Sequence, residues 1–270
     1  MLKITGNYFL GIFLYTLVII LLADFGRILL KYVFHASWIH SRTAFTVAGA
    51  ICALLILLLS ACGIFHAKYI KTTSYDVIIN KTIPERTSMK VVLLADTHFG
   101  YNAGVLHARE LVRKINKQKP DLVCIAGDIF DNEYEAVQNP DRIAKTLAGI
   151  KSRYGSFGVF GNHDVTERLL GGFSVASQAK EMRDPRFEEF AKKAKIRILD
   201  DEVMLIDDVF YLVGRKDAQK PGDGTKNRIE PEVILSGLDK AKPIIVLEHQ
   251  PKQLKELETA GADMQLCGHT

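Results

Sequence analysis

The sequence is poor in cysteine and carries only a small net charge. Nothing in the cysteine spacing indicates a zinc finger or a disulfide framework. The four cysteines are Cys52, Cys62, Cys124 and Cys267. We expect them to be buried and reduced, the usual state of free cysteine in protein interiors. The formal charge of +4 is too small and too dispersed to indicate nucleic-acid binding.

Nucleotide-binding motifs are missing as well. The sequence has no Gly-x-Gly-x-x-Gly after a predicted strand and no phosphate-binding loop ending in Gly-Lys-Ser or Gly-Lys-Thr. It also contains no internal repeat and no low-complexity tract. What is present is a chain of 270 residues, long enough for one large domain or two small ones.

Two long apolar runs stand near the start of the chain. Residues 4–30 contain only Asp24 and Arg27 as charged side chains, and residues 43–65 contain none. Each run meets the requirement of about 20 apolar residues for crossing a bilayer core. A cleaved signal peptide would have a shorter apolar run and an Ala-x-Ala site, and two buried helices of a soluble protein are the other alternative. We predict a membrane anchor over residues 1–72, with these two runs as transmembrane helices.

Basic residues at the ends of the runs predict the orientation of the anchor. Lys31 and Arg42 lie between the runs, whereas Lys3, Lys68 and Lys71 flank their outer ends. By a small margin, the positive-inside rule favours both outer ends on the cytoplasmic side. We therefore expect a protein of the cell membrane that passes through it more than once, with the remainder of the chain in the cytoplasm.

The remainder of the chain alternates between strand-like and helix-like segments. Residues 73–88 form a polar connector with a strand-like alternation at 75–79, and residues 89–270 form a globular domain. Such alternation is typical of a layered α/β architecture. The predicted helices cover residues 105–118, 142–154, 187–195 and 254–259, and a predicted β-hairpin joins residues 202–206 to residues 209–213.

Five predicted strands end in side chains that can bind metal ions. These strands cover residues 91–95, 122–126, 157–160, 244–247 and 264–267. The polar side chains that follow them are Asp96, His98, Asp128, Asn162, His163, His249 and His269. In open α/β sheets, ligands gather outside the carboxyl ends of strands. Carboxylate, carboxamide and imidazole groups suit manganese, iron, zinc or nickel, and the number of such groups suits two ions better than one.

Each motif has a simpler interpretation when it is taken alone. Asp96 before His98 is more often a capping aspartate beside a surface histidine, and Gly-Asp after a strand is often only a turn. His249, two residues before Pro251, is also compatible with a core histidine bonded to the backbone. The occurrence of all the motifs in this order, each after a strand, argues against coincidence.

Taken together, the motifs resemble those of the calcineurin-like metallophosphoesterase superfamily. They are Asp96-x-His98, Gly127-Asp128-x-x-Asp131, Gly161-Asn162-His163-Asp164, the histidine of Glu248-His249-Gln250-Pro251, and Gly268-His269-Thr270. The resemblance covers residues 90–270, and residues 212–217 further resemble a bacterial membrane-associated branch. It implies a four-layer αββα sandwich preceded by the two transmembrane helices.

The resemblance also implies a role for each residue. The metal ligands would be Asp96 and His98 for a first ion, Asp128 as a bridge, and Asn162, His249 and His269 for a second ion. His163 would stand beside the phosphate and either donate a proton to the leaving oxygen or stabilise the charge there. A hydroxide bridging the two ions would then attack a phosphomonoester, phosphodiester or pyrophosphate. Arg215 is a candidate for binding a substrate phosphate, and a solvated loop arginine is the alternative.

Smaller features of the motifs bear on the substrate. Asp131-Asn132-Glu133 stands where protein serine/threonine phosphatases of the superfamily carry Asp-Arg-Gly, which argues against that activity. Asp131 is interpreted as a turn residue or as a residue that supports the ligands without binding metal, and Asp164 either orients His163 or caps the next segment. A phosphate ester at a membrane surface, such as one carried by a lipid, fits the anchor best, and we expect no nucleic-acid partner.

The family pattern continues as Gly-His-Thr-His, whereas this sequence stops at Thr270. We therefore expect a fragment whose first metal site lacks its last histidine. The alternative is a non-catalytic membrane protein with a degenerate phosphoesterase-like domain.

Overall fold

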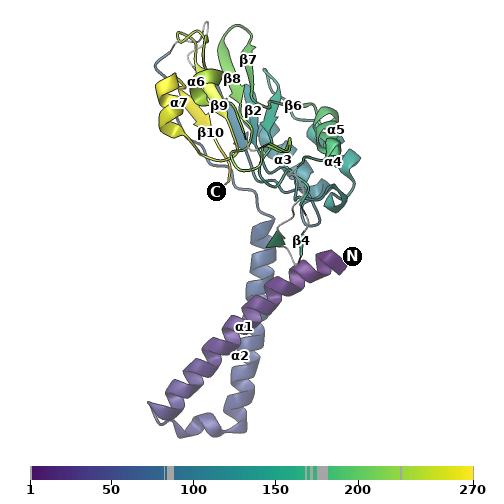
Figure 1. Ribbon diagram of the computed structural model, residues 1–270. Coiled ribbons are helices and arrows are strands. Elements are labelled where there is room, and N and C mark those ends of the chain that lie inside the picture. Colours follow the sequence, from purple (N-terminus) through teal and green to yellow (C-terminus); the bar gives the residue numbers. More distant parts are fainter. Residues whose placement is uncertain are drawn as a thin grey trace. The chain divides into compact units, whose positions relative to one another are not determined.

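The computed structural model divides the chain into two compact units, Met1–Lys71 and Thr72–Thr270. It describes residues 2–81, 83, 88–167, 169–170, 173–174, 182–225 and 227–269. Figure 1 shows a helical first unit and a second unit built from sheets and helices.

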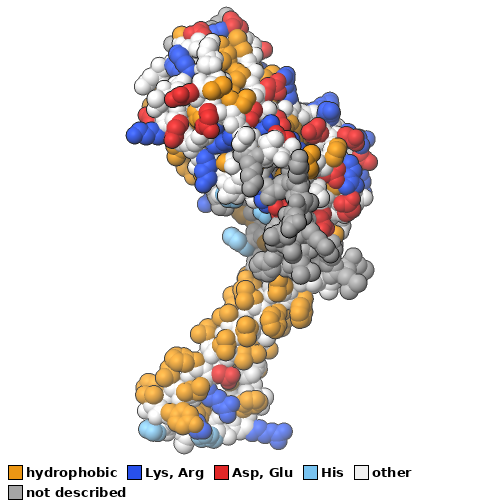
Figure 2. Space-filling view, viewed as in Figure 1, with side chains coloured by type: hydrophobic (Ala, Val, Ile, Leu, Met, Phe, Trp, Pro, Cys, Tyr) orange, Lys and Arg blue, Asp and Glu red, His pale blue; other side chains and the backbone are white. Residues whose placement is uncertain are grey.

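The first unit is a pair of long helices. Helix α1 (Leu2–Tyr32) is joined to helix α2 (Arg42–Ala67) through the short 3-10 helix η1 (Ser37–His40). The Ser41 hydroxyl accepts a hydrogen bond from the Ala44 N–H and so begins α2. Tyr8–Tyr32 and Arg42–Ala67 are long and apolar enough to cross a membrane, and only 6% of an apolar 18-residue stretch in each is buried within the protein. Figure 2 shows apolar side chains over both helices, whereas charges of both signs spread over the second unit.

Asp24 and Arg27 do not form the ion pair that their spacing suggests. Within the described part of the chain, the Arg27 guanidinium instead lies over the Phe45 ring, 5.8 Å from its centroid. This contact joins α1 to the start of α2, which lies next to it in the unit.

The second unit contains a parallel four-stranded sheet. Across this sheet the strands are β1 (Val91–Leu94), β2 (Leu122–Ala126), β3 (Ser156–Val159) and β6 (Ile196–Ile198). The helices that connect them are α3 (Val105–Gln118), α4 (Pro140–Leu147) and α5 (Pro185–Lys193), and the 3-10 helix η2 (Tyr134–Ala136) precedes α4. All neighbouring strands pair in parallel, so their carboxyl ends meet at one edge of the sheet.

A second four-stranded sheet packs against the first. Across this sheet the strands are β10 (Met264–Leu266), β9 (Ile244–Leu247), β8 (Phe210–Gly214) and β7 (Glu202–Ile206). β10, β9 and β8 are parallel, whereas β7 and β8 form the antiparallel hairpin that the sequence predicts. The helices of this half are α6 (Pro231–Ile234) and α7 (Leu254–Ala260). A separate pair of two-residue strands, β4 (Leu169–Leu170) and β5 (Phe173–Ser174), was not predicted.

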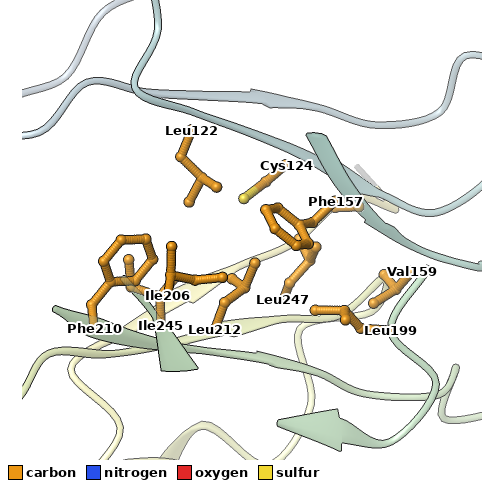
Figure 3. Packing of buried hydrophobic residues seen from close by; sticks show 11 residues of the cluster. Leu122, Cys124, Phe157, Val159, Leu199, Ile206, Phe210, Leu212, Ile245 and Leu247 are labelled. Carbon is orange, nitrogen blue, oxygen red and sulfur yellow. The ribbon is translucent and has the colours of Figure 1, made fainter. Parts of the chain in front are cut away.

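The main hydrophobic core lies between the two sheets. Leu122, Cys124 and Phe157 of the first sheet face Phe210 and Leu247 of the second (Figure 3). All five side chains are at most 5% exposed. Burial of one such side chain stabilises the fold by about 1.5–3 kcal/mol, so the interface between the sheets is a principal source of stability.

Helices cover the outer face of each sheet. Beside the first sheet, the Phe130 ring stacks on Phe187 of α5 with 4.1 Å between centroids and meets Phe190 edge-on. Beside the second sheet, Ile234 of α6 and Leu257 of α7 join a smaller apolar cluster. The predicted four-layer αββα sandwich, with two apolar helices before it, is therefore confirmed (Figure 1).

Two elements differ from the prediction. The helix predicted over residues 142–154 runs from Pro140 to Leu147, because the N–H groups of Ala148 and Gly149 turn back to close it. The strand-like alternation at residues 75–79 forms no strand. Tyr75 and Ile78 are 83% and 88% exposed, so the alternating pattern has no buried face on which to pack.

Candidate metal centre

Two glycines allow the strand ends to approach one another closely. A Cβ atom on Gly161 would lie 2.3 Å from Oδ1 of Asp128. A Cβ atom on Gly127, whose φ is +77°, would lie 2.6 Å from Nδ1 of His249. The glycines of the Gly-Asp and Gly-Asn-His-Asp motifs therefore create the space in which the polar side chains meet.

The first group of donors is formed by Asp96, His98 and Asp128. Their ligand atoms lie within 4.8 Å of one another, and His98 Nε2 is 3.7 Å from Asp128 Oδ2. All three residues have positive φ angles, of 52°, 40° and 49°, a conformation that is uncommon outside glycine. Backbone bonds hold it, since the N–H of Asp96 donates to Gly127 O and that of His98 to Asp128 O. Such strained backbone is concentrated at functional sites.

The second group of donors is formed by Asp128, His249 and His269, again within 4.8 Å of one another. His249 Nε2 lies 3.0 Å from Asn162 Oδ1, 3.2 Å from His269 Nδ1 and 3.3 Å from Asp128 Oδ2. The N–H of His269 lies 3.2 Å from Asp96 Oδ2, so this strand end also touches the first group. The predicted loss of a ligand after Thr270 falls outside the described residues.

The backbone fixes the orientation of the His249 ring. Its Nδ1 lies 2.8 Å from the Ala126 carbonyl, which can only accept a hydrogen bond, so Nδ1 carries hydrogen and Nε2 faces Asp128 and Asn162. Burial opposes protonation of His249, but the Asp128 carboxylate and the Ala126 carbonyl outweigh it and raise its pKa to about 9. Burial also opposes the charge of Asp128, yet hydrogen bonds from His249 and His163 hold its pKa below the usual value. A positive charge is therefore favoured where these donors meet.

The donor chemistry fits divalent cations. Asp128 belongs to both groups, and a carboxylate offers two oxygens that can serve two ions. Carboxylate, carboxamide and imidazole together are the ligand set of borderline divalent ions. The structure thus brings all six predicted metal ligands to one edge of the two sheets.

His163 lies beside these donors and contacts a residue that the sequence analysis did not select. Its ring is 5.3 Å from that of His98, edge to face, and its Nδ1 is 2.6 Å from Oδ1 of Asn132. Asp164 does not orient His163. Its carboxylate accepts hydrogen bonds from Phe130 N and Gly161 N, and thereby caps the loop. Burial and the nearby Asp128 charge raise the pKa of Asp164 to about 7.

Arg215 is not the solvated loop arginine of the alternative interpretation, because its side chain has no exposed surface. Nη1 lies 3.2 Å from Oε2 of the equally buried Glu248. Nη2 donates to Gln253 Oε1 at 2.7 Å and to the Ile229 carbonyl at 3.1 Å. Arg228 binds the same Glu248 oxygen at 2.5 Å. The guanidinium thus belongs to a buried ion-pair network. This network lies behind the donor edge, the edge of the two sheets where the six predicted metal ligands meet.

Sequence reasoning missed Asn132 and Glu248 for different reasons. Asn132 was visible only as a departure from the Asp-Arg-Gly of protein phosphatases, and nothing local reveals its contact with His163. Glu248 precedes a predicted ligand, but its partners Arg215 and Arg228 lie 33 and 20 positions away in the sequence. The sequence shows only a glutamate beside a predicted metal ligand, and this does not identify Arg215 or Arg228 as its partner.

Comparison with known proteins agrees with this geometry. The family model described as calcineurin-like phosphoesterase matches residues 89–270. A "transmembrane protein with metallophosphoesterase domain" from Danio rerio is 28% identical over 74% of this chain, and the match covers 44% of that protein. An "uncharacterized metallophosphoesterase" from Aquifex aeolicus is 24% identical over 80% of this chain and 75% of its own length.

A third relative is named for a defined substrate. The UDP-2,3-diacylglucosamine pyrophosphatase LpxG of Chlamydia trachomatis is 20% identical over 71% of this chain and 67% of its own length. The chain thus spans less than half of the Danio rerio protein and two thirds or more of the two bacterial ones. Since the family model extends over the whole region that carries the converging donors, the chain belongs to the calcineurin-like phosphoesterase family.

Proposed function

We propose that the chain is a membrane-anchored phosphoesterase that holds two divalent cations and hydrolyses a phosphate ester or pyrophosphate. The observation that carries this proposal is the position of Asp128, whose carboxylate belongs to both donor groups. With Asp128, Asp96 and His98 would be the ligands of one ion. With the same carboxylate, Asn162, His249 and His269 would be the ligands of the other.

Bound cations in such a pair supply two effects, since they lower the pKa of water and neutralise charge on the phosphoryl oxygens. The contribution of the protein is to fix the donors. Asp128 is 2% exposed and its Oδ1 accepts the N–H of His163 at 2.9 Å, so the carboxylate cannot rotate freely. His249 is held by Ala126. This preorganisation avoids rearrangement during the reaction.

His163 is the proposed general acid. It lies next to the donors without belonging to either group, and its ring is half-buried beside His98. An imidazole can donate a proton to the leaving oxygen of a phosphate ester. Arg215 is left out of the substrate site, since its guanidinium is buried and bonded to Glu248.

A lipid-borne phosphate ester or pyrophosphate is the substrate class that we favour. Two helices of this chain are long and apolar enough to cross a membrane, and the Danio rerio relative is named as a transmembrane protein. LpxG is named for a pyrophosphate bond in a diacylated sugar nucleotide. These features support a substrate that is carried by a lipid and a catalytic domain that is anchored at a membrane.

The test uses the full chain in detergent with manganese. We expect hydrolysis of bis-p-nitrophenyl phosphate or p-nitrophenyl phosphate, and loss of at least 100-fold in kcat for Asp128→Ala, whose carboxylate serves both donor groups. Asp141→Ala is the matched control, because Asp141 is 77% exposed and pairs only with Lys193 among the described residues. Equal rates for the wild type and Asp128→Ala would refute the proposal.

We further propose that the phosphoesterase domain faces the cytoplasm. The basic residues at the outer ends of the two helices, Lys3, Lys68 and Lys71, support this orientation. Protease added to sealed vesicles of known sidedness tests it. Cleavage of the domain in inside-out vesicles, with protection in right-side-out vesicles, is the expected result, and the reverse pattern would contradict it.

A further inference from the structure

We propose that Asn132 is the positioning residue of His163, and that Glu167 and Lys220 determine which end of its amide faces the imidazole. The inference rests on the proposed function, in which His163 donates a proton to the leaving oxygen. It adds a chain of three residues that prepares His163 for this task.

Backbone and side-chain bonds hold His163 from both ends. Its N–H donates to Asp128 Oδ1 at 2.9 Å, and its carbonyl accepts the N–H of Asn132 at 3.0 Å. The Asn132 side chain then returns to the imidazole, with Oδ1 2.6 Å from Nδ1. The ring of His163 is therefore fixed to the loop that follows β2 and carries Asp128.

The neighbours of Asn132 decide how its amide is turned. Nδ2 lies 3.4 Å from the Glu167 carboxylate, and Lys220 forms an ion pair with the same carboxylate. An ionised carboxylate only accepts hydrogen bonds, so the NH₂ group of the amide must face Glu167. Oδ1 must then face His163, and because this oxygen also only accepts, Nδ1 of His163 must carry a hydrogen.

This arrangement selects Nε2 as the reactive nitrogen. With a hydrogen held on Nδ1, the proton that His163 gives up and regains is the one on Nε2. As the bond between phosphorus and the leaving oxygen breaks, the Nε2 proton passes to that oxygen. The neutral imidazole that remains is the Nδ1–H form, which Asn132 Oδ1 already binds.

The backbone explains why an asparagine stands at this position. Asn132 has φ of 56° and is 1% exposed, and asparagine is among the few residues that adopt this conformation readily. Asp131 lies elsewhere, with its Cβ 3.1 Å from the position that a Cβ of Gly100 would take. Among these residues it is thus Asn132, and not Asp131 or Asp164, whose side chain binds the His163 ring. It does so without adding a charge beside Asp128.

The test compares two phosphodiesters that differ in their leaving group. Departure of p-nitrophenolate from bis-p-nitrophenyl phosphate needs little protonation, whereas the more basic phenolate of diphenyl phosphate needs a general acid. Asn132→Gly removes the amide and suits a positive φ. We expect it to lower kcat on diphenyl phosphate by about 10–100-fold, a part of the usual general-acid contribution, and kcat on the nitrophenyl ester by less than about threefold.

Two further variants complete the comparison. Asn132→Asp keeps an acceptor oxygen for Nδ1 but sets a second carboxylate beside Glu167, so it should retain more activity on diphenyl phosphate than Asn132→Gly and less than the wild type. Asn139→Gly is the matched control, since Asn139 also has a positive φ, of 57°, but caps α4 and makes no side-chain bond there. Metal content is measured for each variant. An equal loss on both esters in Asn132→Gly with metal content unchanged would overturn the inference.

A measurement without turnover separates this inference from the proposed function. Long-range ¹H–¹⁵N correlation spectra of histidine-labelled protein, with and without zinc, report the tautomer of His163, assigned with His163→Gln. Hydrogen on Nδ1 in the wild type and a mixture of tautomers in Asn132→Gly are expected. Hydrogen on Nε2 in neutral wild-type His163 would refute the positioning role, even if the enzyme is active. If no ester is hydrolysed, the spectra still decide the tautomer, and only the proposed function fails.

Discussion

Replacement of Arg215 by methionine distinguishes a buried structural arginine from a phosphate-binding one. Both Arg215 and Glu248 have side chains with no exposed surface. Loss of one partner from a buried ion pair costs about 3–5 kcal/mol, because the other charge stays buried without it. Arg228 still neutralises Glu248, so we expect the lower end of this range. For a domain of this size, about 3 kcal/mol lowers the thermal midpoint by roughly 6–12 °C.

The assay follows thermal unfolding of the full chain in detergent through labelling of Cys124 with a thiol reagent. Cys124 has no exposed surface, and burial raises the pKa of its thiol to about 12, so it reacts only after the sheets separate. The measurement is made in a background with Cys52, Cys62 and Cys267 each replaced by serine, since Cys62 is exposed and the other two are partly exposed. Arg197→Met is the control. Arg197 pairs with Glu202 at 2.5 Å, but its side chain is 54% exposed, and such pairs contribute less than about 1 kcal/mol.

Kinetics complete the test of Arg215. Below the thermal midpoint we expect Arg215→Met to keep the KM for p-nitrophenyl phosphate within about twofold, because its guanidinium points into the Glu248 network. The double variant Arg215→Met, Glu248→Met should recover no stability, since removal of Glu248 leaves the nearly buried Arg228 without its carboxylate partner. An unchanged midpoint together with a raised KM would refute this reasoning and support a substrate-binding arginine.

Three further predictions concern the donor edge and the core. Gly161→Ala should lower metal content measured by mass spectrometry by at least about tenfold, because its Cβ would lie 2.3 Å from Asp128 Oδ1. The pKa of His249 is raised to about 9 in the folded protein, from 6.5 in the unfolded chain. Protonated His249 therefore stabilises the metal-free protein fully at pH values below 6.5, and this stabilisation is lost as the pH rises through about 9. At pH 7 metal binding should therefore release about one proton from His249. Calorimetry in buffers of different ionisation enthalpy measures the number of protons released. Equal proton release by His249→Gln would contradict the raised pKa of His249. Phe210→Ala should destabilise the domain by about 3–5 kcal/mol in the Cys124 assay, since Phe210 lies fully buried between the sheets, and a loss below about 1 kcal/mol would show a looser core.

The sequence predicts the sheets and the donor edge well because both are local patterns. Apolar runs such as residues 122–126 mark buried strands, and a polar residue at their ends is fixed by chain continuity. The strand-like alternation at residues 75–79 does not form a strand, because a strand also needs a partner strand and a buried face. Ile78, for example, is 88% exposed. The helix over residues 142–154 was predicted too long, since hydrophobic spacing continues past the hydrogen bonds that close it at Leu147.

Contacts between distant loops could not be predicted in the same way. Asn132 and His163 are 31 positions apart, and their contact depends on how β2 and β3 align in register. The ion pair between Arg215 and Glu248 depends likewise on the pairing of β8 with β9. A single sequence records which residues follow a strand, but the side chains that meet across two strand ends depend on the register and on the loop geometry of both.

The segment after β9 shows how one short stretch serves both the donor edge and the buried network. Glu248, His249 and Gln250 are consecutive and fully or almost fully buried. Glu248 binds Arg215, and Gln250 donates to the buried Asp217 at 3.0 Å, so both neighbours of His249 are tied to the segment that follows β8. His249 lies between them and faces the donors, as alternating side chains of an extended chain do. We therefore expect that weakening either tie shifts His249 relative to the other donors, because the Arg215–Glu248 ion pair and the Gln250–Asp217 hydrogen bond both hold the segment that carries His249.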